Sequence, residues 1–247
     1  FAKECYGYAQ FICYGNMHIW EREPDYPKSL KGLMINYARN SEGVITREEC
    51  EAFLDKIGSG QTNINQILQI SQEPTFLQYD EECYLISETI PIDDSWKAQV
   101  TCCLNELFED AEYVIQRDIC SGWFNKLPTL PFNLKWTPLL LQEILAFNSD
   151  ISFRTIPALY GQALDTLHAA IVEIDSPLQS FADVVYAYVR ENLNLPQRML
   201  AEELRQILRD AGMINGNELV LNMHKALDDY RFAWSDGNKR VHIHGGW

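Results

Sequence analysis

The spacing of apolar residues along the chain predicts the same set of elements twice. Residues 29–87 and residues 180–244 each match three short amphipathic helices followed by a two-stranded β-hairpin. In both copies the first helix has apolar residues at positions i, i+3, i+4 and i+7, which is the spacing of one helix face. These positions are Leu30, Leu33, Met34 and Tyr37 in the first copy and Phe181, Val184, Val185 and Tyr188 in the second. The chain is therefore expected to contain an internal repeat, and such a repeat determines the architecture.

Local signals predict where the helices and hairpins of each copy begin and end. Thr46, followed three residues later by Glu49, is a capping box that predicts the start of the second helix in the first copy. This second helix is expected to end at Gly58 in one copy and at Gly212 in the other, because glycine readily adopts the conformation that closes a helix. The Asp-Gly pair at 236–237 predicts a tight hairpin turn. The expected third helices cover residues 62–70 and 217–229, and the expected hairpin strands cover residues 75–79, 83–87, 230–234 and 239–244.

The segment between the two copies is predicted to be mainly helical. Thr137 before Pro138 is a clear helix start, because threonine caps a helix and proline fits its first turn. Two interpretations of this segment stay open, a helical linking domain and a third, degenerate copy, since no hairpin matching the other two is evident. The predicted helices cover residues 95–118, 138–147 and 163–174, and a strand is predicted at residues 151–156.

The order helix, helix-turn-helix and hairpin resembles the winged-helix (winged helix-turn-helix) fold, in two copies. The match is to an order of elements rather than to a family signature, and it covers about half of the chain. The resemblance implies a mainly α, α+β fold class and a function in binding nucleic acid or protein. It divides the chain into an aromatic N-terminal arm (1–27), winged-helix module 1 (28–90), a helical linking domain (91–175) and winged-helix module 2 (176–247).

The distribution of charge narrows the candidate partners. The chain of 247 residues has a formal net charge of −15. Module 2 is nearly neutral, with eight basic and nine acidic residues, so the acidity lies in the first two-thirds of the chain. A nucleic acid repels an acidic surface, because its backbone is negatively charged. Module 2 is therefore the candidate for binding DNA, whereas the acidity elsewhere favours solubility or protein contacts.

Other features of the sequence favour an intracellular protein without catalytic residues. An odd number of cysteines, seven, without framework spacing predicts reduced thiols and a cytoplasmic location. No apolar run is long enough for a membrane span. Phosphate-binding glycine motifs, His-Glu-x-x-His, Gly-x-Ser-x-Gly and Cys-x-x-Cys are absent from the sequence, so we expect no enzyme activity, no cofactor and no metal site. His242 and His244 share a strand face but lack a third ligand, and Cys102-Cys103 fits a helix face better than a redox pair.

The candidate nucleic-acid-binding residues follow from the winged-helix resemblance. A recognition helix presents polar residues to base edges, while the second helix and the hairpin contact phosphates. Three acidic residues, Glu218, Asp228 and Asp229, are expected to oppose phosphates on the same side. The candidates are Arg198 at the start of the second helix, Asn217, Asn222, His224 and Lys225 on the third helix, and Lys239 and Arg240 on the hairpin.

Three hypotheses about function result. In the first, the chain is a regulatory segment of a larger intracellular protein that binds DNA through module 2. In the second, it is a scaffold for protein partners, chiefly through module 1, whose third helix lacks Lys and Arg and whose hairpin tip, residues 80–82, is acidic. In the third, it is the non-catalytic part of an enzyme whose active site lies upstream of Phe1. No membrane partner is expected, and the sequence does not indicate an oligomeric state.

Overall fold

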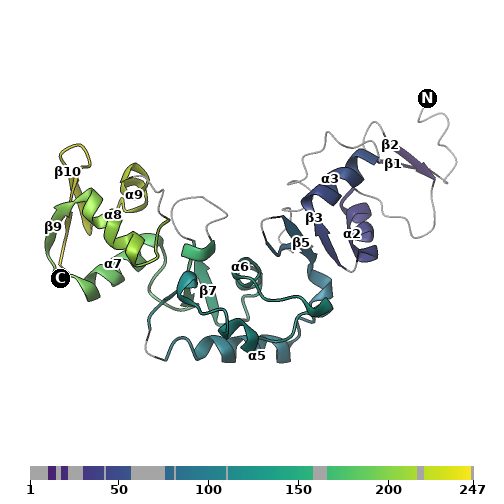
Figure 1. Cartoon of the computed structure of the whole chain (residues 1–247), viewed down its shortest axis with the longest axis horizontal. Helices are drawn as coiled ribbons and strands as arrows, with labels where there is room; N and C mark the ends of the chain where they lie inside the picture. Colours follow the sequence, from purple (N-terminus) through teal and green to yellow (C-terminus); the bar gives the residue numbers. More distant parts are fainter. Residues whose placement is uncertain are drawn as a thin grey trace. The chain divides into compact units, whose positions relative to one another are not determined.

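The computed structural model shows an α+β chain of short helices and small antiparallel sheets (Figure 1). It divides into two compact units, unit 1 with Phe1–Pro91 and Thr129–Leu134, and unit 2 with Ile92–Pro128 and Lys135–Trp247. The α+β class agrees with the prediction from the sequence. The structure describes residues 11–14, 18–21, 30–41, 43–56, 76–80, 82–109, 111–157, 166–215 and 220–245.

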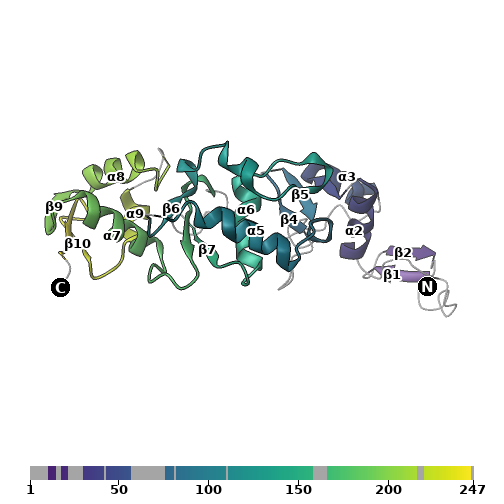
Figure 2. The same cartoon turned by 90° about the horizontal axis from the view of Figure 1, so that it is seen from below.

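One order of elements, a helix, a strand, at least one further helix and a hairpin, occurs among the described residues of both units. In each three-stranded sheet, the strand after the first helix pairs with the last strand, which is central. The N-terminal segment contains α2 (Leu30–Asn40), β3 (Val44–Thr46), α3 (Arg47–Lys56), β4 (Phe76–Gln78) and β5 (Cys83–Ile86), with sheet order β3-β5-β4. The C-terminal segment contains α7 (Phe181–Asn192), β9 (Gln197–Leu200), α8 (Ala201–Asp210), α9 (Val220–Ala226), β10 (Phe232–Ser235) and β11 (Arg240–Ile243), with sheet order β10-β11-β9 (Figure 2).

The middle segment follows the same order, with 3-10 turns in place of one helix. Its sheet order, β6-β8-β7, again places the last strand in the centre. The middle segment therefore shares its sheet topology with the other two segments. The elements are α5 (Asp94–Asn105), β6 (Val114–Ile115), η2 (Gln116–Asp118), η3 (Trp123–Lys126), α6 (Pro138–Phe147), β7 (Phe153–Ile156), η5 (Thr166–His168) and β8 (Ala170–Glu173), while η1 (Ser87–Thr89) and η4 (Pro131–Asn133) belong to unit 1.

Two helix predictions for the middle segment were wrong. The predicted helix 95–118 ends at Asn105, and its C-terminal part contains β6 and η2. The acidic residues from Glu106 to Glu112 explain the early end, since negative charge is unfavourable at the C-terminus of a helix. The predicted helix 163–174 instead contains β8, which pairs with β7 in the hairpin that the sequence had not revealed.

Several local predictions are confirmed by hydrogen bonds and backbone geometry. The Thr46 hydroxyl accepts from the Glu49 amide at 3.1 Å, and a Glu49 carboxylate oxygen accepts from the Thr46 amide at 2.8 Å. Thr137 caps α6 in the same way, through the Leu140 amide at 3.1 Å. The predicted hairpins correspond to β4–β5 and β10–β11. Within the aromatic arm, β1 (Phe11–Tyr14) and β2 (His18–Glu21) form a further antiparallel pair, whereas the predicted helix at 62–70 lies outside the described residues.

Each unit has an apolar core that covers one face of a sheet. In unit 1, Ile45, Phe76 and Tyr84 pack with buried residues of α2 and α3. In unit 2, the buried faces of α7, α8 and α9 pack with Met199, Phe232, Val241 and Ile243. The same core also includes residues of the middle sheet, so the middle and C-terminal segments share one core within unit 2. These middle residues are Ile115, Ile156, Ala170 and Val172.

Candidate nucleic-acid interface

The structure moves one candidate residue from a helix to a strand. Arg198 does not lie at the start of the second helix, because α8 begins at Ala201 and Arg198 is part of β9. In the register of β9 with β11, Arg198 is opposite His242 and Leu200 is opposite Arg240. The sequence prediction for Arg198 was therefore wrong in its position, and the structure brings this residue next to the hairpin.

Strand alternation places the basic side chains of the hairpin on one face of the sheet. Val241 and Ile243 are buried in the core, so Arg240 and His242 point to the opposite face. Arg198 belongs to that face, since Met199 next to it is buried. We call the face of the β10-β11-β9 sheet that points away from the core the outer face. Its charged or titratable members are Arg198, Arg240, His242 and His244.

The two histidines of the outer face are close neighbours. The rings of His242 and His244 lie 4.5 Å apart between centroids. Partial desolvation, His244 and the Arg198 guanidinium all lower the pKa of His242 below its usual value. Both histidines were considered as metal ligands from the sequence, but no group of three His, Cys, Asp or Glu side chains able to hold a metal occurs among the described residues. Their position favours a role beside the arginines instead.

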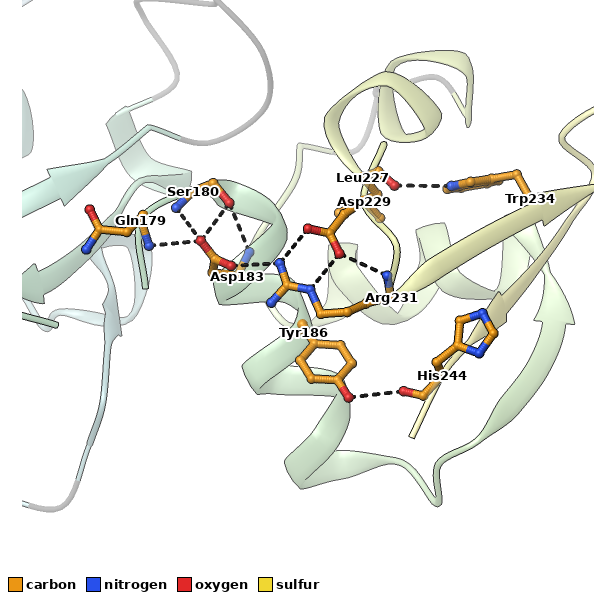
Figure 3. A network of polar contacts seen from close by, with 9 residues as sticks. All are labelled: Gln179, Ser180, Asp183, Tyr186, Leu227, Asp229, Arg231, Trp234 and His244. Carbon is orange, nitrogen blue, oxygen red and sulfur yellow. Dashed lines mark hydrogen bonds and ion pairs between the residues drawn. The ribbon is translucent and has the colours of Figure 1, made fainter. Parts of the chain in front are cut away.

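The third helix is held against the hairpin by Trp234. The indole Nε1 of Trp234 donates to the Leu227 carbonyl at 3.3 Å (Figure 3), and its ring meets the His224 ring edge-on at 5.1 Å. His224 is therefore half-buried, whereas Lys225 next to it is exposed. Asn222 is half-buried on the same helix, and Asn217 lies outside the described residues. Of the predicted helix contacts, Lys225 is the one with an exposed charge.

An ion-pair network compensates two of the carboxylates in the C-terminal segment. Arg231 lies between Asp183 at the start of α7 and Asp229, with nitrogen–oxygen distances of 2.7 and 2.6 Å (Figure 3). Its guanidinium also lies 5.0 Å from the centre of the Tyr186 ring. Hydrogen bonds from Arg231 lower the pKa of Asp229. Asp229, which the sequence placed among the residues opposing phosphates, thus shares the Arg231 guanidinium with Asp183, while Asp228 is exposed.

Other acidic side chains of this segment have defined partners as well. Glu202 forms an ion pair with Arg205, Glu203 accepts from the Leu200 amide at 2.9 Å, and Asp210 accepts from Gln206 at 2.7 Å. Four basic side chains contrast with these carboxylates, because they are exposed and have no carboxylate within 4.0 Å among the residues that the structure describes. They are Arg198, Lys225, Lys239 and Arg240.

The sequence did not reveal that His242 and His244 lie on the same sheet face as Arg198 and Arg240. Side-chain direction alternates along residues 197–200, as in a strand. Gln197 and Met199 point inward, whereas Arg198 and Leu200 point outward. Four residues directly before a helix gave no strand pattern long enough to be recognised. Once β9 is known, its pairing with β11 places Arg198 beside His242.

The described part of unit 1 exposes more carboxylates than cations. Glu48, Glu51 and Asp55 are exposed on α3. At the tip of the β4–β5 hairpin, the Asp80 carboxylate accepts from the amides of Glu82 and Cys83 at 2.9 and 2.7 Å, so it stabilises the turn. The described part of unit 1 therefore offers an acidic surface.

Comparison with family models, with curated proteins and with solved structures found no match for this chain. Within the described residues, no helix combines the length and the apolar composition needed to cross a bilayer. The function must be inferred from the geometry of the chain itself.

Proposed function

We propose that the C-terminal segment is a winged-helix module that binds nucleic acid, DNA in the first place. The observation that carries this proposal is the contrast between its charges. Arg198, Lys225, Lys239 and Arg240 are exposed without a described carboxylate partner, whereas Asp183 and Asp229 are compensated by Arg231. The segment therefore exposes cations without a described carboxylate partner although its net charge is close to zero. Phosphate contacts by such cations supply most of non-specific nucleic-acid affinity.

The order of elements supports a winged-helix arrangement. A helix, a strand, two helices and a hairpin follow one another, and the first strand completes the sheet of the hairpin. In this fold the third helix enters the major groove and the hairpin touches the backbone. In this chain α9 would present Lys225, and the hairpin would present Lys239 and Arg240. Trp234 joins these two contacts, because it holds α9 against β10.

The test is fluorescence-anisotropy binding of the full chain to random duplex DNA at low salt. The variant Lys225→Glu/Lys239→Glu/Arg240→Glu is compared with the control Lys56→Glu/Lys126→Glu/Lys135→Glu, which changes the net charge of −15 by the same amount elsewhere. We expect the wild type and the control to bind alike and the first variant to lose binding. The slope of log affinity against log salt should fall by roughly one for each phosphate contact removed.

Two results would overturn the proposal. The first is that the wild type does not bind DNA even at low salt. The second is that both triple variants lose affinity equally, since this would show an effect of total charge rather than of the named residues.

A second candidate function is protein binding by unit 1. The exposed carboxylates of α3, Glu48, Glu51 and Asp55, favour it, because they suit a basic protein surface and repel DNA. The test is binding of a Lys/Arg-rich peptide to Glu48→Gln/Glu51→Gln/Asp55→Asn. The matched control in unit 2 is Glu173→Gln/Asp175→Asn/Glu191→Gln, which neutralises three exposed carboxylates as well. Equal peptide affinity of both variants would contradict this function.

A further inference from the structure

The three sheets differ on the face opposite to their helix-covered core. In the N-terminal sheet, Leu77 and Leu85 are paired across β4 and β5 on that face, and both are buried. In the middle sheet, Ala170 and Val172 on β8 are buried in the core shared with the C-terminal segment. In the C-terminal sheet, the central strand β11 instead carries Arg240 and His242 at these positions. The last sheet thus has a polar outer face where the others are apolar.

A polar outer face has a simple structural explanation, since an exposed sheet face with a large apolar patch would favour aggregation. Solubility alone requires polar side chains of any kind, whereas the charged or titratable side chains of this face are all basic. Its members are Arg198 and Leu200 on β9, Ala233 and Ser235 on β10, and Arg240, His242 and His244 on or beside β11.

Carboxylates near this face do not neutralise it. Glu203, in the first turn of α8, accepts from the amide of Leu200 at the end of β9, and Asp236 lies in the hairpin turn. Neither forms an ion pair with Arg198 or Arg240 among the described residues. Leu200 is 45% exposed beside Arg240, so the face also offers an apolar contact.

We propose that the outer face binds the phosphate backbone of a nucleic acid through Arg198 and Arg240, and that protonated His242 and His244 add to this binding. The inference rests on the proposed function, because it names a contact surface of the same segment. Arginine suits phosphate, since its planar guanidinium donates two parallel hydrogen bonds. Each histidine that gains a proton adds one positive charge to a face that holds two arginines.

The two histidines give the proposal a specific signature, which is tighter binding at lower pH. Arg198 and His244 oppose the protonation of His242, and an anion on the face removes that opposition. Binding should therefore be coupled to proton uptake. If DNA were bound through Lys225 on α9 alone, binding would not be coupled to proton uptake by His242 and His244. Neither of them lies on α9, whose histidine is His224.

The experiment measures anisotropy binding of one duplex to the full chain at about pH 8 and about pH 5.5, on either side of the usual histidine pKa. We expect wild-type affinity to rise about three- to tenfold at the lower pH. This is the range expected when one or two exposed cations gain contacts with phosphates. His242→Gln/His244→Gln should abolish the rise in affinity between the two pH values. The control His224→Gln should keep the rise. Arg198→Gln should weaken binding at both pH values.

The outcomes separate this inference from the proposed function. A rise that persists in His242→Gln/His244→Gln, or that disappears in His224→Gln, overturns the inference and leaves DNA binding standing. No binding by the wild type at either pH overturns the proposed function itself. Competition by polyglutamate as strong as by DNA overturns the assignment to nucleic acid and indicates an acidic protein. Equal thermal unfolding of all variants, followed by circular dichroism, shows that the fold is unchanged.

Discussion

The guanidinium of Arg117 occupies the space that a side chain at Gly212 would fill. Gly212 follows α8 with a φ of +73°, and a Cβ atom there would overlap the Arg117 guanidinium. Arg117 donates to the carbonyls of Arg209 and Asp210 at 3.4 and 3.2 Å, so it satisfies the end of α8. His168 also contacts the Gly212 carbonyl through Nδ1, at 2.6 Å. Two residues of the middle segment thus fix the end of a C-terminal helix.

The first prediction concerns Gly212→Ala, which should destabilise the chain more than Gly237→Ala. Both glycines have positive φ, and a left-handed alanine costs about 1–2 kcal/mol. No atom lies within 4 Å of a Cβ at Gly237, so that variant reports the backbone cost alone. Gly212→Ala also displaces Arg117, and each lost hydrogen bond adds about 1 kcal/mol. Urea unfolding measures the difference.

A double-variant cycle identifies the cause of this difference. If Arg117→Ala is already present, Gly212→Ala should cost no more than Gly237→Ala, because the displaced guanidinium is absent. Equal costs of the two glycine substitutions in the wild type would contradict the role assigned to Arg117.

The second prediction concerns Arg231→Met, which should lower the free energy of unfolding by about 2–4 kcal/mol at neutral pH. The variant leaves Asp183 and Asp229 without their cation, and their side chains are only 20% and 22% exposed. The control is Arg39→Met, because Arg39 and Glu88 form an exposed ion pair worth about 0–1 kcal/mol. A similar loss in both variants would contradict the prediction.

The effect of Arg231→Met should depend on pH. Burial raises the pKa of Asp183, but hydrogen bonds from Ser180 and Arg231 outweigh it, so the pKa lies below its usual value. The pKa of Asp229 is also lowered. Groups with a lowered pKa stabilise the fold above their unfolded pKa of about 4, and this contribution is lost as the pH falls through the folded value. The difference in the free energy of unfolding between wild type and Arg231→Met should therefore become smaller below about pH 4.

Structural features that depend on a few neighbouring residues were predicted correctly from the sequence. The capping pair Thr46 and Glu49 and the helix end at Gly212 depend on local hydrogen bonds and backbone conformation. Met213 donates to Leu208 and Gly212 donates to Arg209, which is the hydrogen-bond pattern of a glycine-terminated helix. The hairpins were predicted because their turns lie next to their strands.

Elements that depend on distant partners were missed. Residues 170–173, Ala-Ile-Val-Glu, form a short apolar run that fits a helix or a strand equally well, and pairing with β6 and β7 decides for a strand. The strand β9 depends in the same way on β11, which follows forty residues later. For this reason Arg198 was predicted to lie at the start of a helix, and its position beside His242 was missed.

The third prediction concerns Arg154, which links the middle sheet to the segment that leads into α7. Arg154 Nη2 donates to the Leu178 carbonyl at 2.6 Å and to Ser176 at 3.4 Å, and Nε donates to Ile174 at 3.4 Å. Arg154→Met should lower the free energy of unfolding by about 1–3 kcal/mol, the range for hydrogen bonds to a charged group.

The control for Arg154→Met is Arg190→Met, since Arg190 and Glu112 form an exposed pair 3.6 Å apart. This control should change stability by less than about 0.5 kcal/mol. Guanidinium chloride unfolding of both variants, followed by circular dichroism, measures the difference. If Arg154→Met is as stable as Arg190→Met, the link to the carbonyls contributes nothing measurable.

The last prediction concerns Trp234, which connects the third helix to the hairpin. Trp234→Phe removes the hydrogen bond to Leu227 and should cost about 1 kcal/mol of stability. The matched control is Trp136→Phe, because Trp136 makes the same kind of bond to the Pro128 carbonyl, at 2.8 Å, within the middle segment. Both variants should lose similar stability, but only Trp234→Phe should weaken DNA binding, since it loosens α9 with Lys225.

The DNA affinity of Trp234→Phe should still rise at low pH, because the outer face with His242 is untouched. Weaker DNA binding in both variants would show that affinity depends on global stability, and unchanged binding in Trp234→Phe would remove α9 from the interface.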